Sequence, residues 1–137
     1  MASPNLEIRQ DRDRMRLQRA LSDALPQLSR NGHLLDAEED LVVYGCDGVP
    51  AYQQTPLAVA LPGDTGQVAQ IVSACGELKI PIVPWGAGTG LSGGAMAVAD
   101  GIVLSLARMN RILDIDLDHR CVRVEPGVTN LAVSHAV

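Results

Sequence analysis

The sequence predicts an α/β fold (α+β in its overall layout): a small parallel sheet with helices, followed by a β-hairpin. Two short apolar runs, residues 58–61 and 80–83, flank a segment with helical spacing of apolar residues, which indicates a βαβ unit. A third run, residues 101–106, is nearly all apolar, as in strands buried on both faces. Apolar and acidic residues then alternate with a period of two, which indicates a hairpin.

Residues 1–39 are expected to form a helical lead-in to this domain. Residues 1–10 are polar and should be frayed, whereas residues 12–25 show a helical pattern that Pro26 should end. The expected apolar face of this helix consists of Leu17, Leu21, Ala24, Leu25 and Leu28. The opposite face, with Arg12, Arg16 and Arg19, is expected to be solvated.

The helix between the first two strands has a defined start and a defined apolar face. Asp64 offers an N-cap, with Gln67 as its capping-box partner, and the helix should end near Leu78. Its buried face should consist of Val68, Ile71, Val72 and Cys75. Cys75 is therefore expected to be a core residue rather than a reactive thiol.

The hairpin is expected to have one buried face and one solvated face. The buried face should consist of Leu113, Ile115 and Leu117, and the solvated face of Asp114, Asp116 and Asp118. Pro126 and Gly127 should end the second hairpin strand, and Thr129 should cap a helix that starts near Asn130.

The most informative segment follows the second strand, where five glycines fall between positions 86 and 94. Glycine allows backbone to approach a ligand closely, and successive N–H groups in such a turn can bind an anion. Thr89 and Ser92 add hydroxyl donors. The residues expected to bind a phosphate or pyrophosphate are Pro84, Trp85, Gly86, Ala87, Gly88, Thr89, Gly90, Leu91, Ser92, Gly93 and Gly94.

This segment has three alternative interpretations. A Walker loop requires a Lys after the last glycine, and none is present. Residues 88–93 match the Rossmann pattern G-x-G-x-x-G, which would imply an NAD-binding module, but few residues remain for a helix before Asp100 and Gly101. Pro84 is also awkward inside a central strand. A glycine-rich surface turn without a ligand is the third interpretation.

Residues 84–95 resemble the pyrophosphate loop of FAD-binding domains of the vanillyl-alcohol-oxidase/p-cresol-methylhydroxylase (PCMH) type. Residues 44–48, 56–59 and 124–131 share this resemblance, which is strongest to FAD-linked glycolate oxidase subunits and their D-lactate dehydrogenase relatives. Trp85 departs from the Arg common at this position in the family, so no phosphate contact is expected from its side chain.

The resemblance implies that residues 40–137 are the N-terminal part of a PCMH-type domain that binds FAD, truncated before its second half. It implies a longer enzyme that oxidises a 2-hydroxy acid such as glycolate or D-lactate, with substrate-binding and catalytic groups in later domains. No catalytic residue is assigned in this chain. A second flavin-related subunit and an iron–sulfur subunit are implied partners. A non-catalytic remnant that keeps only the fold is the alternative.

Composition excludes several other classes. A net charge of −5 disfavours nucleic acid as a partner. Three widely spaced cysteines and three scattered histidines give no disulfide framework and no metal site. No uninterrupted apolar run is long enough for a signal peptide or a membrane span. A cytoplasmic protein is expected, with any membrane association peripheral and made through partner subunits.

Overall fold

The computed structural model describes residues 4–46, 53–87 and 92–137, with side chains from residue 10 onward. The helices are α1 (Pro4–Ala24), α2 (Pro26–Arg30), α3 (Glu38–Leu41), the 3-10 helix η1 (Val42–Tyr44), α4 (Thr65–Leu78) and α5 (Asn130–Ala136). The strands are β1 (Leu34–Leu35), β2 (Ala58–Ala60), β3 (Ile82–Trp85), β4 (Ile102–Ser105), β5 (Ile112–Asp116) and β6 (Cys121–Val124). This arrangement confirms the predicted α/β class.

Four strands form one sheet in the order β1-β2-β4-β3. The buried strand β4 lies between β2 and β3 and is parallel to both, and β1 adds an antiparallel edge. The β2–α4–β3 unit predicted from the sequence is therefore parallel, with β4 inserted between its two strands. The prediction misplaced β3 by two residues, and Pro84 lies inside the strand. Because β3 is an edge strand, it has a neighbour on one side only. A proline is tolerated there, since its missing N–H need not break a hydrogen bond to a neighbouring strand.

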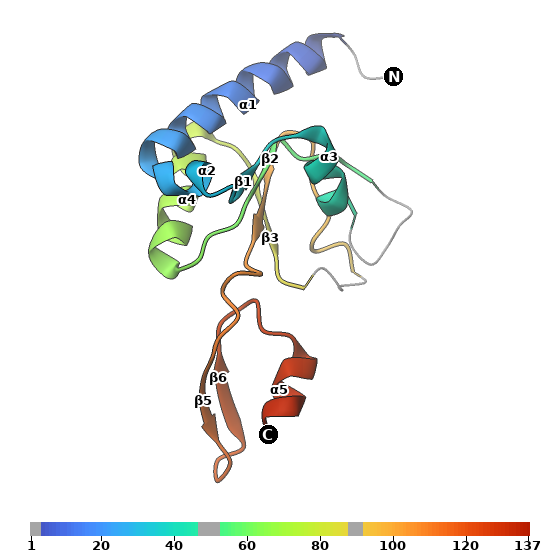
Figure 1. Cartoon of the computed structure of the whole chain (residues 1–137). Coiled ribbons are helices and arrows are strands. Elements are labelled where there is room, and N and C mark those ends of the chain that lie inside the picture. Colours follow the sequence, from blue (N-terminus) through green and yellow to red (C-terminus); the bar gives the residue numbers. More distant parts are fainter. Residues whose placement is uncertain (1–3, 47–52, 88–91) are drawn as a thin grey trace.

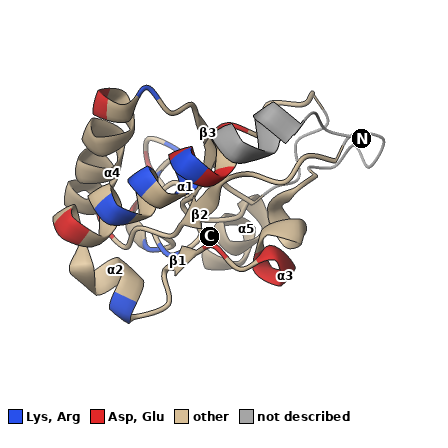
Figure 2. Ribbon diagram, turned by 90° about the horizontal axis from the view of Figure 1, so that it is seen from above, with Lys and Arg blue, Asp and Glu red and all other residues tan. Residues whose placement is uncertain are grey.

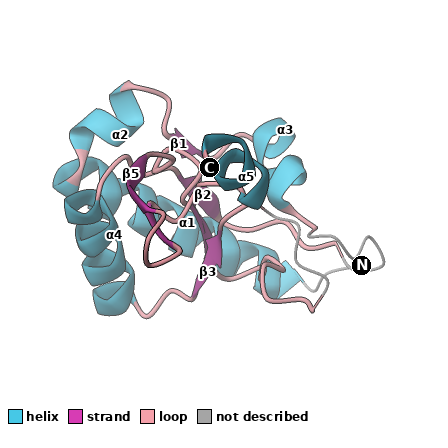
Figure 3. Cartoon of the chain, turned by 90° about the horizontal axis from the view of Figure 1, so that it is seen from below, coloured by secondary structure: helices cyan, strands magenta, loops and turns pink. Residues whose placement is uncertain are grey.

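Each face of this sheet carries its own apolar cluster. Helices lie against both faces (Figures 1 and 3). Helices α1, α2 and α4 cover one face, where Leu17 and Ile71 pack with Ile102 in a continuous buried cluster. Helix α3 lies on the other face, where Leu41 packs with Val103. Successive residues of β4 alternate between the two clusters, as the period of two in a strand requires.

The N-terminal helix differs from its prediction at both ends. It begins at Pro4 rather than near residue 12, because the polar residues before position 12 include good helix formers. Pro26 ends α1 as predicted and also starts the short helix α2, where a missing N–H costs nothing. Ala24 is exposed, contrary to the predicted apolar face, because the chain changes direction after it. Arg12, Arg16 and Arg19 are exposed, as predicted. Figure 2 shows basic residues in blue along α1.

Helix α4 follows its prediction closely. Gln67 N–H donates to Asp64 Oδ1 at 2.9 Å, and Gln67 Oε1 accepts from the N–H of Gly63 at 2.8 Å. Ile71 and Cys75 are fully buried, whereas Val72 is 46% exposed because it lies at the margin of the apolar face. Burial raises the pKa of the Cys75 thiol to about 11, as expected for a core cysteine.

The hairpin of β5 and β6 forms as predicted, with a register irregularity between Ile112 and Asp114, but its predicted buried face is wrong. Leu113 is 48% exposed and Leu117 is 71% exposed. Figure 1 shows β5, β6 and α5 extending away from the four-stranded sheet. Alternation decides which side chains share a face, whereas burial requires another element to cover that face. The cap of α5 is as predicted, since Ala132 N–H donates to Thr129 Oγ1 at 3.2 Å.

Candidate functional site

The candidate site lies at the carboxyl ends of β3 and β4. Trp85, the last residue of β3, is in register with Ser105, the last residue of β4. Leu106 N–H donates to the carbonyl oxygen of Trp85 at 2.8 Å, which fixes the two strand ends together. The glycine-rich segment leaves from this point. Ligands in open α/β sheets usually bind outside the carboxyl ends of the strands.

The structure describes seven of the eleven residues expected to bind the cofactor. Pro84 and Trp85 end β3, and Gly86 and Ala87 follow it. Ser92, Gly93 and Gly94 lead into a turn. In this turn the N–H of Met96 donates to the carbonyl oxygen of Gly93 at 3.3 Å. The other four, Gly88, Thr89, Gly90 and Leu91, lie outside the described residues.

The segment after the turn argues against the Rossmann interpretation. Between Ser92 and β4, every residue is described and none is helical. A dinucleotide fingerprint of the Rossmann type requires a helix to begin at the glycine pattern. The helix that would place its N-terminus at a pyrophosphate is therefore not formed by this segment.

The described glycines of the site differ in whether backbone conformation or packing requires glycine at their positions. Gly93 has a φ of +73°, a left-handed conformation that favours glycine. A Cβ added to Gly94 would meet no described atom within 4 Å, and one added to Gly86 would lie 3.7 Å from the Pro126 carbonyl oxygen, an ordinary contact. Packing among the described residues therefore does not require glycine at positions 86 and 94. Bare backbone at these two positions therefore fits a ligand that approaches it closely, such as a pyrophosphate.

Glycines outside the segment provide the contrast. A Cβ on Gly127 would lie 2.2 Å from the Leu106 carbonyl oxygen, and one on Gly101 would lie 2.7 Å from that of Pro81. Both glycines are required by close backbone packing. Gly127 N–H also donates to the Met109 carbonyl at 2.8 Å, so the chain after β6 is held against the chain after β4.

Trp85 is a structural side chain at this site. Its ring makes an edge-to-face contact with Tyr44, with 5.4 Å between ring centroids and 69° between planes. It packs against the cluster of Leu41 and Val103 on the α3 face of the sheet. The indole therefore anchors the end of β3.

An ion pair between Arg111 and Glu125 joins the segments before β5 and after β6. The Glu125 side chain is only 10% exposed, and its Oε1 accepts from Arg111 Nη2 at 2.7 Å and from Nε at 3.1 Å. Its Oε2 accepts from the backbone N–H of Arg111 at 2.9 Å. The Arg111 guanidinium and N–H lower the pKa of Glu125. Sequence analysis missed this pair because its members are 14 positions apart on segments that flank the hairpin.

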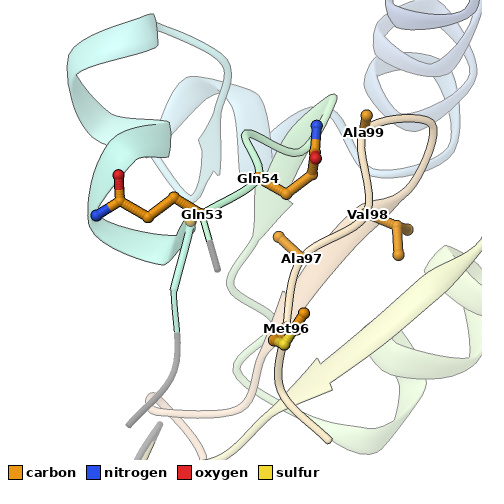
Figure 4. A pocket seen from close by; sticks show the side chains of 7 residues that line it. Gln53, Gln54, Met96, Ala97, Val98 and Ala99 are labelled. Atoms are coloured by element: carbon orange, nitrogen blue, oxygen red, sulfur yellow. The ribbon is translucent and has the colours of Figure 1, made fainter. Parts of the chain in front are cut away.

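An apolar pocket of about 250 Å³ adjoins the turn that ends the glycine-rich segment (Figure 4). Residues 96–99 form one wall, and Gln53 and Gln54 come from the opposite side of the pocket. The N–H of Gln54 donates to the Gly45 carbonyl at 2.9 Å, which ties that side together. The pocket contains no charged side chain among its described lining residues, so these residues offer no ionic contact to a ligand.

Comparison with known proteins agrees with this geometry. A family model described as an FAD binding domain matches residues 56–137. The chain belongs to this family of FAD-binding domains, and FAD is its cofactor. No helix in the described part of the chain is long and apolar enough to cross a membrane.

The chain is 45% identical over 127 residues to glycolate oxidase subunit GlcD of Escherichia coli (strain K12), covering 93% of this chain and 25% of that protein. It is 38% identical over 117 residues to D-2-hydroxyglutarate dehydrogenase of Xanthomonas citri pv. viticola, covering 85% and 24%. The structure of p-cresol methylhydroxylase with substrate bound matches 98% of this chain and 25% of its own, with a TM-score of 0.64 and 24% identity.

These similarities confirm the resemblance that the sequence suggested. The fold is that of PCMH-type flavoproteins. The chain spans about a quarter of the length of the relatives it matches.

Proposed function

We propose that this chain is the first part of the FAD cradle of a flavin-dependent 2-hydroxy-acid oxidoreductase. The observation that carries the proposal is the 45% identity to a glycolate oxidase subunit over nearly the whole chain. The position of the glycine-rich segment at the carboxyl edge of the sheet supports it. Within the chain, we assign residues 40–137 to the FAD-binding domain and residues 1–39 to a helical lead-in.

The proposed role of the chain is to hold the pyrophosphate of FAD. Backbone N–H groups between Gly86 and Gly94 would bind the phosphate oxygens, and the hydroxyls of Thr89 and Ser92 would add donors. Glycine at positions 86 and 94 supports this role, because packing among the described residues does not require it there. When bound, FAD supplies a ring that accepts a hydride from the substrate. The residues of this chain bind and orient the cofactor, and no catalytic residue is assigned among them.

The substrate and partners of the whole enzyme are part of the proposal. We propose a small 2-hydroxy acid such as glycolate or D-lactate, bound by domains beyond this chain. We also propose a second flavin-related subunit and an iron–sulfur subunit as partners, and a cytoplasmic location in which any membrane contact is made through those subunits. The name of the similar glycolate oxidase subunit supports assembly with other subunits.

A titration of the purified chain tests the cofactor assignment. Flavin fluorescence follows the binding of FAD, and the emission of Trp85, the one tryptophan in the sequence, reports from the start of the glycine-rich segment. A parallel sample receives NAD. We expect saturable binding of FAD and none of NAD.

Two results would contradict the proposal. Binding of NAD without FAD would favour a nicotinamide module. A chain that circular dichroism shows to be folded, but that binds neither cofactor, would indicate a remnant that keeps the fold without the function.

A further inference from the structure

Ser105 is a buried polar residue that the site described above leaves unexplained. It ends the central strand β4, in which the three preceding residues are apolar and buried. The residue is 1% exposed, and its Oγ has no hydrogen-bond partner among the described residues. Sequence analysis did not single it out, although it is the only polar residue in the apolar run 102–106.

A buried hydroxyl without a partner destabilises the fold that contains it. Removing a hydroxyl from water without a compensating hydrogen bond costs free energy, and native structures rarely leave such groups unpaired. Alanine would fit the same position and would avoid this cost. The hydroxyl of Ser105 therefore needs an explanation outside the packing of the chain.

The position of Ser105 supplies that explanation. Strand register places it beside Trp85, and the next residue along the chain from Trp85 is Gly86. Ser105 and Trp85 lie on the same face of the sheet, because residues in register on parallel strands point the same way. The hydroxyl is therefore located where the glycine-rich segment leaves the sheet.

We propose that Ser105 is a further cofactor-binding residue, whose hydroxyl donates a hydrogen bond to a phosphate oxygen of FAD. The proposal rests on the proposed function of the chain. A hydroxyl bound to a charged oxygen makes a stronger hydrogen bond than one bound to a neutral group. Ser105 is 1% exposed, so the proposal includes a shift of the groups that cover its hydroxyl when FAD binds.

The test compares three substitutions in the same chain. Ser105→Ala removes the hydroxyl, and Ser105→Cys keeps a similar shape with a much weaker donor. Ser134→Ala is the matched control, since Ser134 Oγ donates to the Asn130 carbonyl at 3.1 Å on α5, away from β4. Each variant is measured for its thermal midpoint without cofactor and for FAD affinity by quenching of Trp85 emission.

We expect both Ser105 variants to bind FAD about ten-fold more weakly than the wild-type chain, as for loss of a hydrogen bond to a charged group. Their thermal midpoints without FAD should be equal to or higher than that of the wild type, because an unpaired hydroxyl has been removed. Ser134→Ala should keep the FAD affinity of the wild type.

The contrary outcomes separate this inference from the proposed function. Ser105 variants with unchanged FAD affinity would overturn the assignment of Ser105 alone. A lowered thermal midpoint with unchanged affinity would show instead that the hydroxyl has a structural partner. A wild-type chain that binds no FAD would overturn the proposed function, and the assignment of Ser105 with it.

Discussion

The four-stranded sheet with its helices and the hairpin with α5 both carry apolar side chains, but they bury them to different degrees. In the sheet and its helices, Leu17, Ile71 and Val103 are all 0% exposed. In the second region, Leu113 is 48% exposed and Leu131 on α5 is 64% exposed. Figure 1 shows the reason, since helices cover the sheet and the hairpin extends away from it.

This difference separates what a local pattern determines from what distant contacts determine. Apolar runs predicted the three parallel strands of the sheet, with β3 misplaced by two residues, and period-two alternation predicted the hairpin. Capping residues correctly predicted the starts of α4 and α5. These patterns did not predict that only one region would be covered. The stability of the described chain is therefore expected to depend mainly on the sheet and its helices.

Core substitutions should show the largest effect and test the comparison directly. Ile71→Ala removes three buried carbon atoms from the buried face of α4, and we expect it to lower the free energy of unfolding by about 2–5 kcal/mol. Leu113→Ala, at an exposed position of the hairpin, should change it by less than about 0.5 kcal/mol. Urea denaturation followed by circular dichroism measures both. Equal losses would mean that the hairpin is part of the cooperative core.

A smaller effect should appear where the two regions join, as a dependence of stability on pH. Arg111 lowers the pKa of Glu125 in the folded chain, so the fold favours the carboxylate. The contribution is therefore present above the unfolded pKa of about 4.3 and is lost as the pH falls through the lowered folded pKa. Asp116, whose pKa is lowered chiefly by the N–H of His119 and then by its ring, acts in the same direction within the hairpin.

The variant Glu125→Gln isolates the first contribution. Between about pH 7 and about pH 3.5, its thermal midpoint should fall less than that of the wild-type chain. Glu77→Gln, at an exposed position on α4, serves as the control and should follow the wild type. If Glu125→Gln shows the same acid dependence as the wild type, the ion pair does not stabilise the junction.

Much of the fold was predictable because its signals are local. Asp64 and Thr129 were identified as caps from their own neighbourhoods, and both accept the expected N–H. The apolar run of β4 indicated a strand buried on both faces. The position of Pro84 was misjudged because the strand order, which makes β3 an edge, depends on contacts that no local pattern contains.

The site was predictable in part for the same reason. A cluster of glycines in a short segment is a local signal, and it identified the candidate loop. Sequence analysis did not single out Ser105, which we propose as a cofactor-binding residue, or the pair of Arg111 with Glu125, because their positions depend on which segments the fold brings together. Only the structure could show which glycines the packing requires and which it leaves open.

The most direct test of the claim that the glycine-rich segment holds FAD uses glycines that packing does not require. Gly94→Ala places a methyl group where no described atom lies within 4 Å, and Gly76→Ala does the same on α4, far along the chain from the site. Both variants should fold at least as stably as the wild type, and Gly76→Ala should bind FAD normally. The account predicts that Gly94→Ala binds FAD at least about ten-fold more weakly, because the methyl group blocks backbone that the pyrophosphate approaches. Equal FAD affinity in the two variants would contradict the claim that this glycine-rich segment holds the cofactor.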